Sequence, residues 1–531
     1  MESSLQYDHY QGAVYPLDLQ EEPNHGDYRR THIKSLVNLC AEYIVRDASF
    51  TKVAVQHIPN HLSVALMQAA LLDNRDRSME TLISHWPLNS LSLRKLAPSL
   101  YTSVVPLYNS TYLTDIVRQS LRYTTCLSHT FLECLKKRTP TRLKYLDMSG
   151  FPTAEVILFY LATHCMLAHN ESRQTVMVDM YNRVVNLLPD QTESTDTSYQ
   201  LMTADTTIPD SSFTVKMDAY VASDKTHAEL CKALKVSGFQ ESKLKIVLEK
   251  LDATCLGEEK LQILLQQVNP KFLLGLRLKY NSLTSEDFCK LCPVFERFDK
   301  LTALDLSCNS IRNASDRLAH LLSSLPHLVR LDLSNNRIKT RLRQILSNIP
   351  SALQYLRLVG CGLSLTDIAY LSVSHHIAGL QELDLSENNL HPAAGNLCKL
   401  LKGCRSTLQT LEIEDCKLRD NVMEVVTGDL ASMESLMYLN LADNPLSLSA
   451  HEYLMESVVG LTNIRAYRFS FAKDCYSPDI PDYEMVMRQD MHVAQMYHIK
   501  RNIRGDEAGP YTRPRLIFME LQRWDYGDYV E

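Results

Sequence analysis

One short pattern of leucines recurs through the second half of the chain, and it restricts the possible folds more than any other feature. The pattern reads LxxLxLxxNxL, and successive copies are 25 to 28 residues apart. Its leading residues are Leu273, Leu301, Leu328, Leu353, Leu380, Leu408 and Leu436. A repeat of this period indicates a row of stacked units. The length of 531 residues agrees, because it exceeds what one compact core supports.

Each unit predicts a short strand followed by a helix. The alternating leucines place one side of the strand in the core, and the Asn or Cys after it turns inward, where it must bond nearby backbone groups. Between strands, segments such as SDRLAHLLSSL (315–325) carry leucines at helical spacing. We therefore predict an α/β leucine-rich-repeat solenoid, in which a curved parallel sheet carries outer helices and a helical N-terminal module precedes it. Partners should bind the strand positions that point away from the leucines.

Those outward positions carry an uneven distribution of charge. Four carboxylates occupy two adjacent rows with no basic residue between them, so we expect an acidic concave patch suited to a partner that bears Lys or Arg. Two tyrosines flank the patch and are candidate aromatic anchors. The alternative is a solvated sheet face that binds nothing in particular. The predicted target-binding residues are Tyr355, Arg357, Glu382, Asp384, Glu412, Glu414 and Tyr438.

The remaining sequence divides around the repeats. The strand-like RLKYLDMSGF (142–151) and the alternating FTVKMDAYV (213–221) indicate irregular repeats before the regular ones. The predicted parts are a disordered tail at 1–30, a helical module at 31–139, irregular repeats at 140–270 with a disordered loop at 189–212, regular repeats at 271–470, and a C-terminal cap and tail at 471–531.

Composition and the missing motifs exclude several function classes. The net charge of -7 does not favour nucleic-acid binding, and no run of about 18 apolar residues indicates a membrane span. We expect a protein of the cytoplasm or the nucleus. No GxxxxGK(S/T), HExxH or GxSxG motif occurs, so we expect no enzyme activity and no cofactor. Cys289 and Cys292 form a CxxC without a second half-site, so we expect no metal.

The N-terminal module contains a short motif on a predicted helix. The segment 32–48 is predicted to be an amphipathic helix, and within it Ser35, Leu36, Cys40 and Ile44 match SLxxxCxxxI. This pattern resembles the BC box through which substrate receptors of cullin-RING ubiquitin ligases dock on Elongin C.

A second motif begins fourteen residues after Ile44. The segment 57–71 is predicted to start another helix, with the proline in its first turn. Ile58, Pro59, Leu62 and Leu66 match apolar-Pro-x-x-apolar-x-x-x-apolar, which resembles a Cullin-2 box. Each motif is degenerate alone, and the two together in this order are more specific. The alternative is that both apolar helix faces simply cap the solenoid.

The segment METLISHWPLNSLSLRKL (79–96), with Trp86 and Pro87, resembles a signature of the PRAME and leucine-rich-repeat-containing-protein-14 family. Further likeness lies at 142–150, 215–235 and 371–390 and extends over about 33 to 500. The resemblance implies a horseshoe repeat fold, recruitment of Elongin B/C, Cullin-2 and its RING subunit, and a protein substrate bound by the repeats. One branch of the family is also linked to restraint of NF-kappa-B signalling through the inhibitor-kappa-B kinase.

Two functions therefore remain. In one, the chain is the substrate-recognition subunit of a Cullin-2 RING ubiquitin ligase, in which other subunits perform the chemistry. In the other, it is a non-catalytic scaffold or inhibitor of a signalling kinase complex, without ubiquitin transfer.

Overall fold

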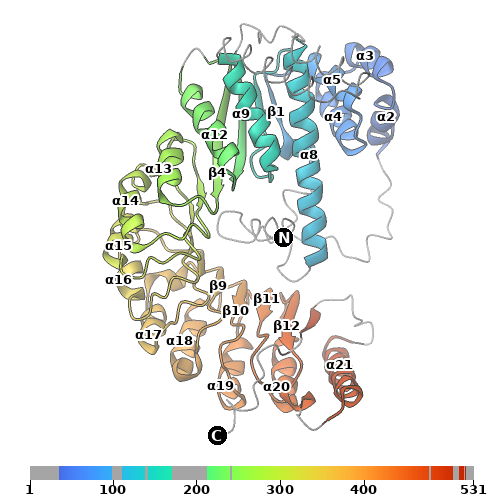
Figure 1. Cartoon of the computed structure of the whole chain (residues 1–531). Coiled ribbons are helices and arrows are strands. Elements are labelled where there is room, and N and C mark those ends of the chain that lie inside the picture. Colours follow the sequence, from blue (N-terminus) through green and yellow to red (C-terminus); the bar gives the residue numbers. More distant parts are fainter. Residues whose placement is uncertain are drawn as a thin grey trace. The chain divides into compact units, whose positions relative to one another are not determined.

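The computed structural model describes residues 35–97, 110–137, 141–169, 212–239, 242–476, 480–505, 514–519 and 521. The chain forms two compact units, of which the first ends at Arg277 and the second begins at Leu278 (Figure 1). The disordered segments predicted at 1–30 and, except for its last residue, at 189–212 lie outside the described residues.

The first unit opens with a group of packed helices, as predicted (Figure 1). They are α2 (Leu36–Ile44), α3 (Ala48–His57), the 3-10 turn η1 (Asn60–Leu62), α4 (Ser63–Leu72), α5 (Asp76–Ser84), α6 (Leu93–Leu96) and α8 (Ser110–Lys136). Helix α4 contacts α2, α5, α6 and α8, and its Leu66 and Met67 are buried. Trp86 is buried after α5, and its indole Nε1 donates to the Ser90 carbonyl at 2.9 Å. The Trp-Pro element thus joins the helices to the sheet.

A parallel sheet completes the first unit. Its strands, in chain order, are β1 (Ser90–Ser92), β2 (Tyr145–Asp147), β3 (Phe213–Val221), β4 (Leu244–Ala253) and β5 (Gly275–Arg277). The helices that accompany it are α9 (Glu155–His169), α12 (Asp224–Ser237) and α13 (Glu258–Gln267). Strand β3 occupies the segment whose alternation predicted it. The sheet begins at β1, ahead of residue 140, where the repeats were predicted to start. The prediction missed this strand because its short SLS sequence carries no repeat pattern.

The second unit contains the regular repeats. Its strands are β6 (Ala303–Asp305), β7 (Arg330–Asp332), β8 (Tyr355–Arg357), β9 (Glu382–Asp384), β10 (Thr410–Glu412), β11 (Tyr438–Asn440), β12 (Ala466–Ser470) and β13 (Arg515–Met519). Its helices are α14 (Ser285–Phe295), α15 (Ser315–Ser323), α16 (Leu342–Leu346), α17 (Leu365–Leu371), α18 (Ala394–Cys404), α19 (Asp420–Leu430), α20 (Leu448–Val458) and α21 (Asp482–Arg504). The strands pair in parallel in chain order, and each helix from α14 to α21 contacts the next. The predicted leucine-rich-repeat fold is confirmed.

Inward asparagines join neighbouring repeats, as expected. The Asn388 amide nitrogen donates to the Leu385 carbonyl in its own repeat and to the Leu358 carbonyl in the preceding one, both at 2.8 Å. Asn309, Asn336 and Asn444 make the equivalent pairs of bonds. Where cysteine replaces asparagine, the Cys416 thiol makes the corresponding contacts, to the Leu385 carbonyl of the preceding repeat at 3.3 Å and to the Glu414 carbonyl of its own repeat at 3.5 Å. These hydrogen bonds satisfy buried polar groups that would otherwise destabilise the fold.

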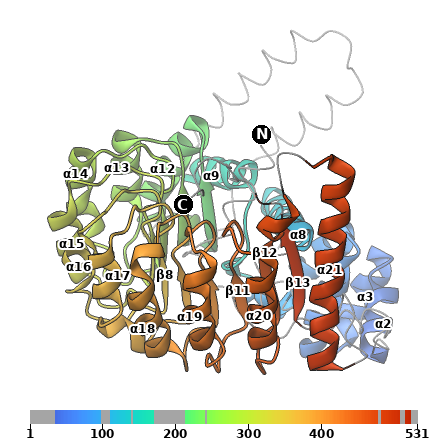
Figure 2. The same ribbon diagram turned by 90° about the horizontal axis from the view of Figure 1, so that it is seen from below.

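At the C-terminal end of the second unit, α21 packs against α20, and β13 pairs with β12 (Figure 2). Phe469, Phe518 and His492 form an aromatic cluster there. Among the described residues, no helix has the length and apolarity needed to cross a membrane.

Candidate protein-binding site

Helix α2 begins at a side-chain cap. The Ser35 hydroxyl accepts a hydrogen bond from the Asn38 amide at 3.2 Å, which satisfies one of the free amide groups of the first turn. Ala41 and Val45 are buried, and α2 packs against α4. One side of α2 is therefore anchored in the module.

The SLxxxCxxxI motif lies mostly on the opposite side of α2. Leu36 is 76% exposed, Ser35 and Cys40 are exposed too, and Ile44 is half-buried. In a helix with 3.6 residues per turn, the buried Val45, nine positions after Leu36, points to the far side from it. The structure thus presents three of the four motif residues to solvent.

Helix α3 extends this exposed apolar surface. The rings of Tyr43 and Phe50 meet edge to face at 6.1 Å, and Phe50 and Val53 are about half exposed. The Thr51 hydroxyl, buried behind them, bonds the Ile44 carbonyl at 3.0 Å and holds α3 against the end of α2. Sequence reasoning missed Phe50 and Val53, although their helical spacing after an Asp cap was a usable signal. We call this surface the docking face; it consists of Ser35, Leu36, Leu39, Cys40, Tyr43, Phe50 and Val53.

The second motif is arranged differently from the prediction. Ile58 and Pro59 are extended and interrupt the helix, so α3 ends at His57 and a 3-10 turn precedes α4. The expected single helix from 57, with proline in its first turn, is therefore wrong, because proline disfavours helical geometry in the residue before it. Pro59 is exposed, Ile58 and Leu62 are half-buried, and Leu66 belongs to the core.

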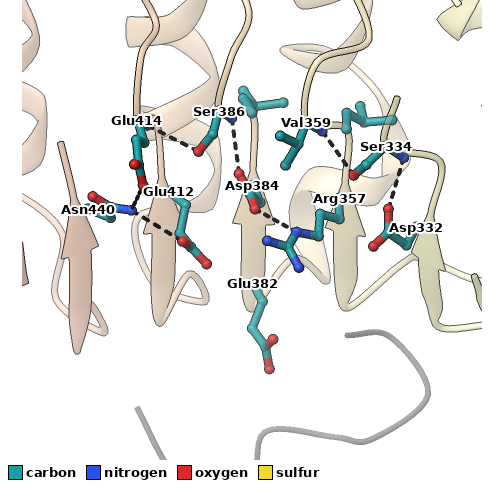
Figure 3. A network of polar contacts seen from close by, with 12 residues as sticks. Asp332, Ser334, Arg357, Val359, Glu382, Asp384, Ser386, Glu412, Glu414 and Asn440 are labelled. Carbon is teal, nitrogen blue, oxygen red and sulfur yellow. Dashed lines mark hydrogen bonds and ion pairs between the residues drawn. The ribbon is translucent and has the colours of Figure 1, made fainter. Parts of the chain in front are cut away.

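The predicted target-binding residues lie on or beside neighbouring strands of the sheet of the second unit, and Figure 3 shows the charged ones. Tyr355↔Glu382 and Thr410↔Tyr438 are register partners, so the side chains form neighbouring rows. The Arg357 Nε donates to Asp384 at 2.7 Å. Arg330 reaches across a row to Glu382 at 3.3 Å and lies over the Tyr355 ring, 4.5 Å from its centre.

Glu412 and Glu414 are held from the next strand. The Asn440 amide nitrogen donates to Glu414 at 2.8 Å and to Glu412 at 3.3 Å (Figure 3). Glu414 also pairs with Arg468 at 3.6 Å. Glu412 is only 9% exposed and has no cationic partner among the described residues.

Burial changes the protonation of this network. It raises the pKa of the Glu412 carboxyl to about 8, an effect that Asp384 increases and Arg357 opposes. Burial and the neighbouring Asp305 raise the pKa of Asp332 to about 6. At neutral pH the Glu412 carboxyl is therefore largely protonated, which removes one negative charge from the face.

The expectation of an exposed acidic patch without nearby bases needs correction. Glu382, Asp384 and Glu412 are buried, and two of them are neutralised by Arg330 and Arg357. Arg330 was missed as a partner because it stands 52 residues before Glu382. The sequence could have indicated this pair, because Arg330 and Glu382 each occupy the first position of their strands, on the same face of the sheet.

Among the described residues, no group of three or more His, Cys, Asp or Glu is arranged to hold a metal ion. The CxxC pair lies on α14, where Cys289 is exposed and Cys292 is buried.

The fold defines the chain as a leucine-rich-repeat protein. Residues 313–498 match the PRAME C-terminal domain. Leucine-rich repeat-containing protein 14 of Xenopus laevis is 26% identical over 484 residues, which cover 84% of this chain and 89% of that protein. Its Homo sapiens counterpart is 30% identical over 249 residues, which cover 44% of this chain and half of that protein. Human PRAME family member 7 is 31% identical over 128 residues, covering 24% of this chain and 27% of that protein.

The chain therefore carries a PRAME C-terminal domain and is a homologue of leucine-rich repeat-containing protein 14 and of PRAME family members, as its motifs predicted. Among solved structures, LegL7 from Legionella pneumophila matches 56% of this chain and the whole of its own chain, at 17% identity and a TM-score of 0.34.

Proposed function

We propose that the chain is the substrate-recognition subunit of a Cullin-2 RING ubiquitin ligase. In this proposal, the docking face binds Elongin C, the segment from Ile58 to Leu66 contacts Cullin-2, and the sheet of the second unit holds the target protein. The exposure of Leu36 and Cys40 carries the proposal. The homology to leucine-rich repeat-containing protein 14 agrees with it.

The exposed face of α2 favours docking over a purely structural role. A helix that only capped the repeats would bury its larger apolar residues, whereas here the small Ala41 is buried and Leu36 points to solvent. Burying a leucine side chain in a partner's pocket contributes about 1.5 to 3 kcal/mol. Cys40, one turn along on the same side, is small enough for a partner helix to approach closely.

The Cullin-2 segment has a mixed role in this proposal. Pro59 is exposed, and Ile58 and Leu62 keep part of their surface available. Leu66 is buried in α4, so it supports the segment and does not contact the cullin directly. The turn at Pro59 would present Ile58, Pro59 and Leu62 to the cullin as one surface.

Co-purification tests the proposal. The full chain is expressed with Elongin B/C and Cullin-2, and the wild type is compared with Leu36→Ala combined with Cys40→Ala. We expect the wild type to retain all three subunits and the variant to lose most of them, because the central contacts of the docking face are gone. Leu365→Ala combined with Val373→Ala is the matched control, since both residues are exposed and apolar in the second unit.

The result also separates the two functions. A wild-type chain that retains no Elongin C, or a variant that retains as much as the wild type, would exclude the ligase role. The chain would then be a scaffold or inhibitor of a signalling complex, in which α2 serves another partner.

A further inference from the structure

A basic surface stands out in the second unit of a chain whose net charge is -7. Between residues 306 and 345, seven side chains are Lys or Arg and two are Asp. Arg317 pairs with Glu296, and Arg330 pairs with Glu382. The other five form what we call the basic edge: Arg312, Arg337, Lys339, Arg341 and Arg343.

The side chains of the basic edge are available to a ligand. Four of them are exposed, and Arg341 is half-buried. Within the described part of the chain, none of the five makes an ion pair or a side-chain hydrogen bond. The two acidic residues of this stretch form no ion pair with them in the described part of the chain: Asp332 is buried in the sheet, and the exposed Asp316 accepts a hydrogen bond from the Gln344 amide.

The fold holds the basic edge together. Strands β6 and β7 pair in register, so the loops that follow them, with Arg312 in the first and Lys339 in the second, lie side by side. Helices α15 and α16 after these loops are also in contact. The buried Asp367 carboxylate accepts hydrogen bonds from the Thr340 amide at 2.8 Å and the Leu342 amide at 3.1 Å, which fixes the second loop. The charges are therefore presented on a rigid support.

The chemistry of the basic edge suits planar oxyanions. Four of its five members are arginines, whose planar guanidinium pairs with carboxylate or phosphate oxygens through two parallel bonds. Residues 312–343 contain no Phe, Tyr or Trp, so this stretch itself offers no aromatic platform for nucleic-acid bases. The apolar residues that alternate with the basic ones in the second loop, Ile338 and Leu342, are buried, so they are not available to enter a membrane surface.

We propose that the basic edge binds an acidic segment of a partner protein, rich in Asp and Glu. The binding does not depend on docking of Elongin C. The four arginines and the lysine attract the partner's carboxylates, and the paired hydrogen bonds of the guanidinium groups fix the position of the acidic segment. This site is separate from the buried carboxylates on β9 and β10.

Fluorescence anisotropy with the full chain and a labelled oligo-glutamate peptide tests the proposal, with an oligo-glutamine peptide as the neutral probe. We expect the glutamate peptide to bind, and its affinity to fall steeply as salt is added. Lys339→Glu combined with Arg343→Glu should weaken binding by about tenfold or more. Lys399→Glu combined with Arg405→Glu changes the net charge equally at exposed positions elsewhere in the unit, and should leave affinity within about twofold.

Three results would overturn the proposal. The first is that the glutamate peptide binds no better than the glutamine peptide, and the second is that the control variant loses as much affinity as the test variant. The third is that duplex DNA or phosphatidylserine vesicles bind more tightly than the glutamate peptide and lose binding in the test variant, which would assign the basic edge to another class of partner. Thermal unfolding of both variants shows whether each is folded, and a fold-neutral substitution, Lys339→Gln, replaces any variant that is not.

Discussion

At the scale of single residues, Glu412 shows how burial changes the chemistry of a side chain that the sequence marks as acidic. Its carboxyl accepts one hydrogen bond from Asn440 and lies near Asp384, whose own charge is paired with Arg357. Burial raises the pKa of Glu412 from 4.5 to about 8. The folded protein therefore favours the protonated acid.

Replacing Glu412 by Gln should stabilise the protein at alkaline pH. Because the folded-state pKa is raised, the contribution of Glu412 to stability is fully present below its unfolded pKa and is lost as pH rises from about 4.5 to about 8. Glu412→Gln keeps the shape without this cost, so we expect about 1 kcal/mol or more of added stability at pH 8 and little change at pH 5. Urea unfolding at both pH values measures it. The exposed Glu434→Gln is the control, and an equal gain at pH 5 and pH 8 would contradict the raised pKa.

At the scale of elements, α20 and α21 meet through two buried histidines. The rings of His451 and His492 are stacked with centres 5.0 Å apart, and the His492 Nδ1 accepts a hydrogen bond from the Ala472 amide at 3.2 Å. Burial lowers the pKa of His451 to about 3 and that of His492 to about 4. Both rings are therefore neutral in the folded protein at neutral pH.

Acid should weaken the contact between α20 and α21. The folded-state pKa values lie below 6.5, so the stability that comes from the neutral rings is present above pH 6.5 and is lost as pH falls towards about 4. His451→Phe keeps a stacked ring that cannot be protonated, and no hydrogen bond of Nδ1 is lost, because this atom has no partner among the described residues. We therefore expect a smaller fall in Tm between pH 7 and pH 4.5 than in the wild type. Differential scanning calorimetry checks this. The control His498→Phe, at an exposed position, should show the same pH dependence of Tm as the wild type. If the Tm of His451→Phe falls with pH as much as that of the wild type, the argument is refuted.

At the scale of the whole molecule, the two proposed ligands use different units of the chain. The docking face lies on α2 and α3 of the first unit, and the basic edge lies around α15 and α16 of the second. Each surface is built from exposed side chains on a buried support, namely Ala41 and Val45 in the first case and Asp367 in the second. Substitutions in one surface should therefore leave the other intact.

A crossed experiment tests this independence. Leu36→Ala with Cys40→Ala should reduce Elongin B/C retention and leave affinity for oligo-glutamate within about twofold, and Lys339→Glu with Arg343→Glu should do the reverse. Additivity of this kind is expected for sites without shared contacts. Loss of both activities in either variant would mean that the substitutions disturb folding or that the surfaces are coupled.

The sequence by itself determined the repeat fold and the position of α2. Leucines at strand alternation and asparagines after each strand have one stable arrangement, because the apolar residues must be buried and the inward amides must be bonded. The apolar spacing over 32–48 similarly predicted a helix there; the structure places α2 within it, capped by Ser35 and ending at Ile44, and α3 begins at Ala48. These features depend on local pattern alone.

Only the tertiary structure decided which face of α2 is exposed and which carboxylates are paired. Both sides of α2 are apolar, so packing against α4, and not the local pattern, determines that Ala41 is buried and Leu36 is left to solvent. The pairing of Arg330 with Glu382 likewise depends on stacking of repeats distant in sequence. The physical reason is the same in both cases: the free energy of a side chain is determined by its neighbours in space, which the residues next to it in the chain do not specify.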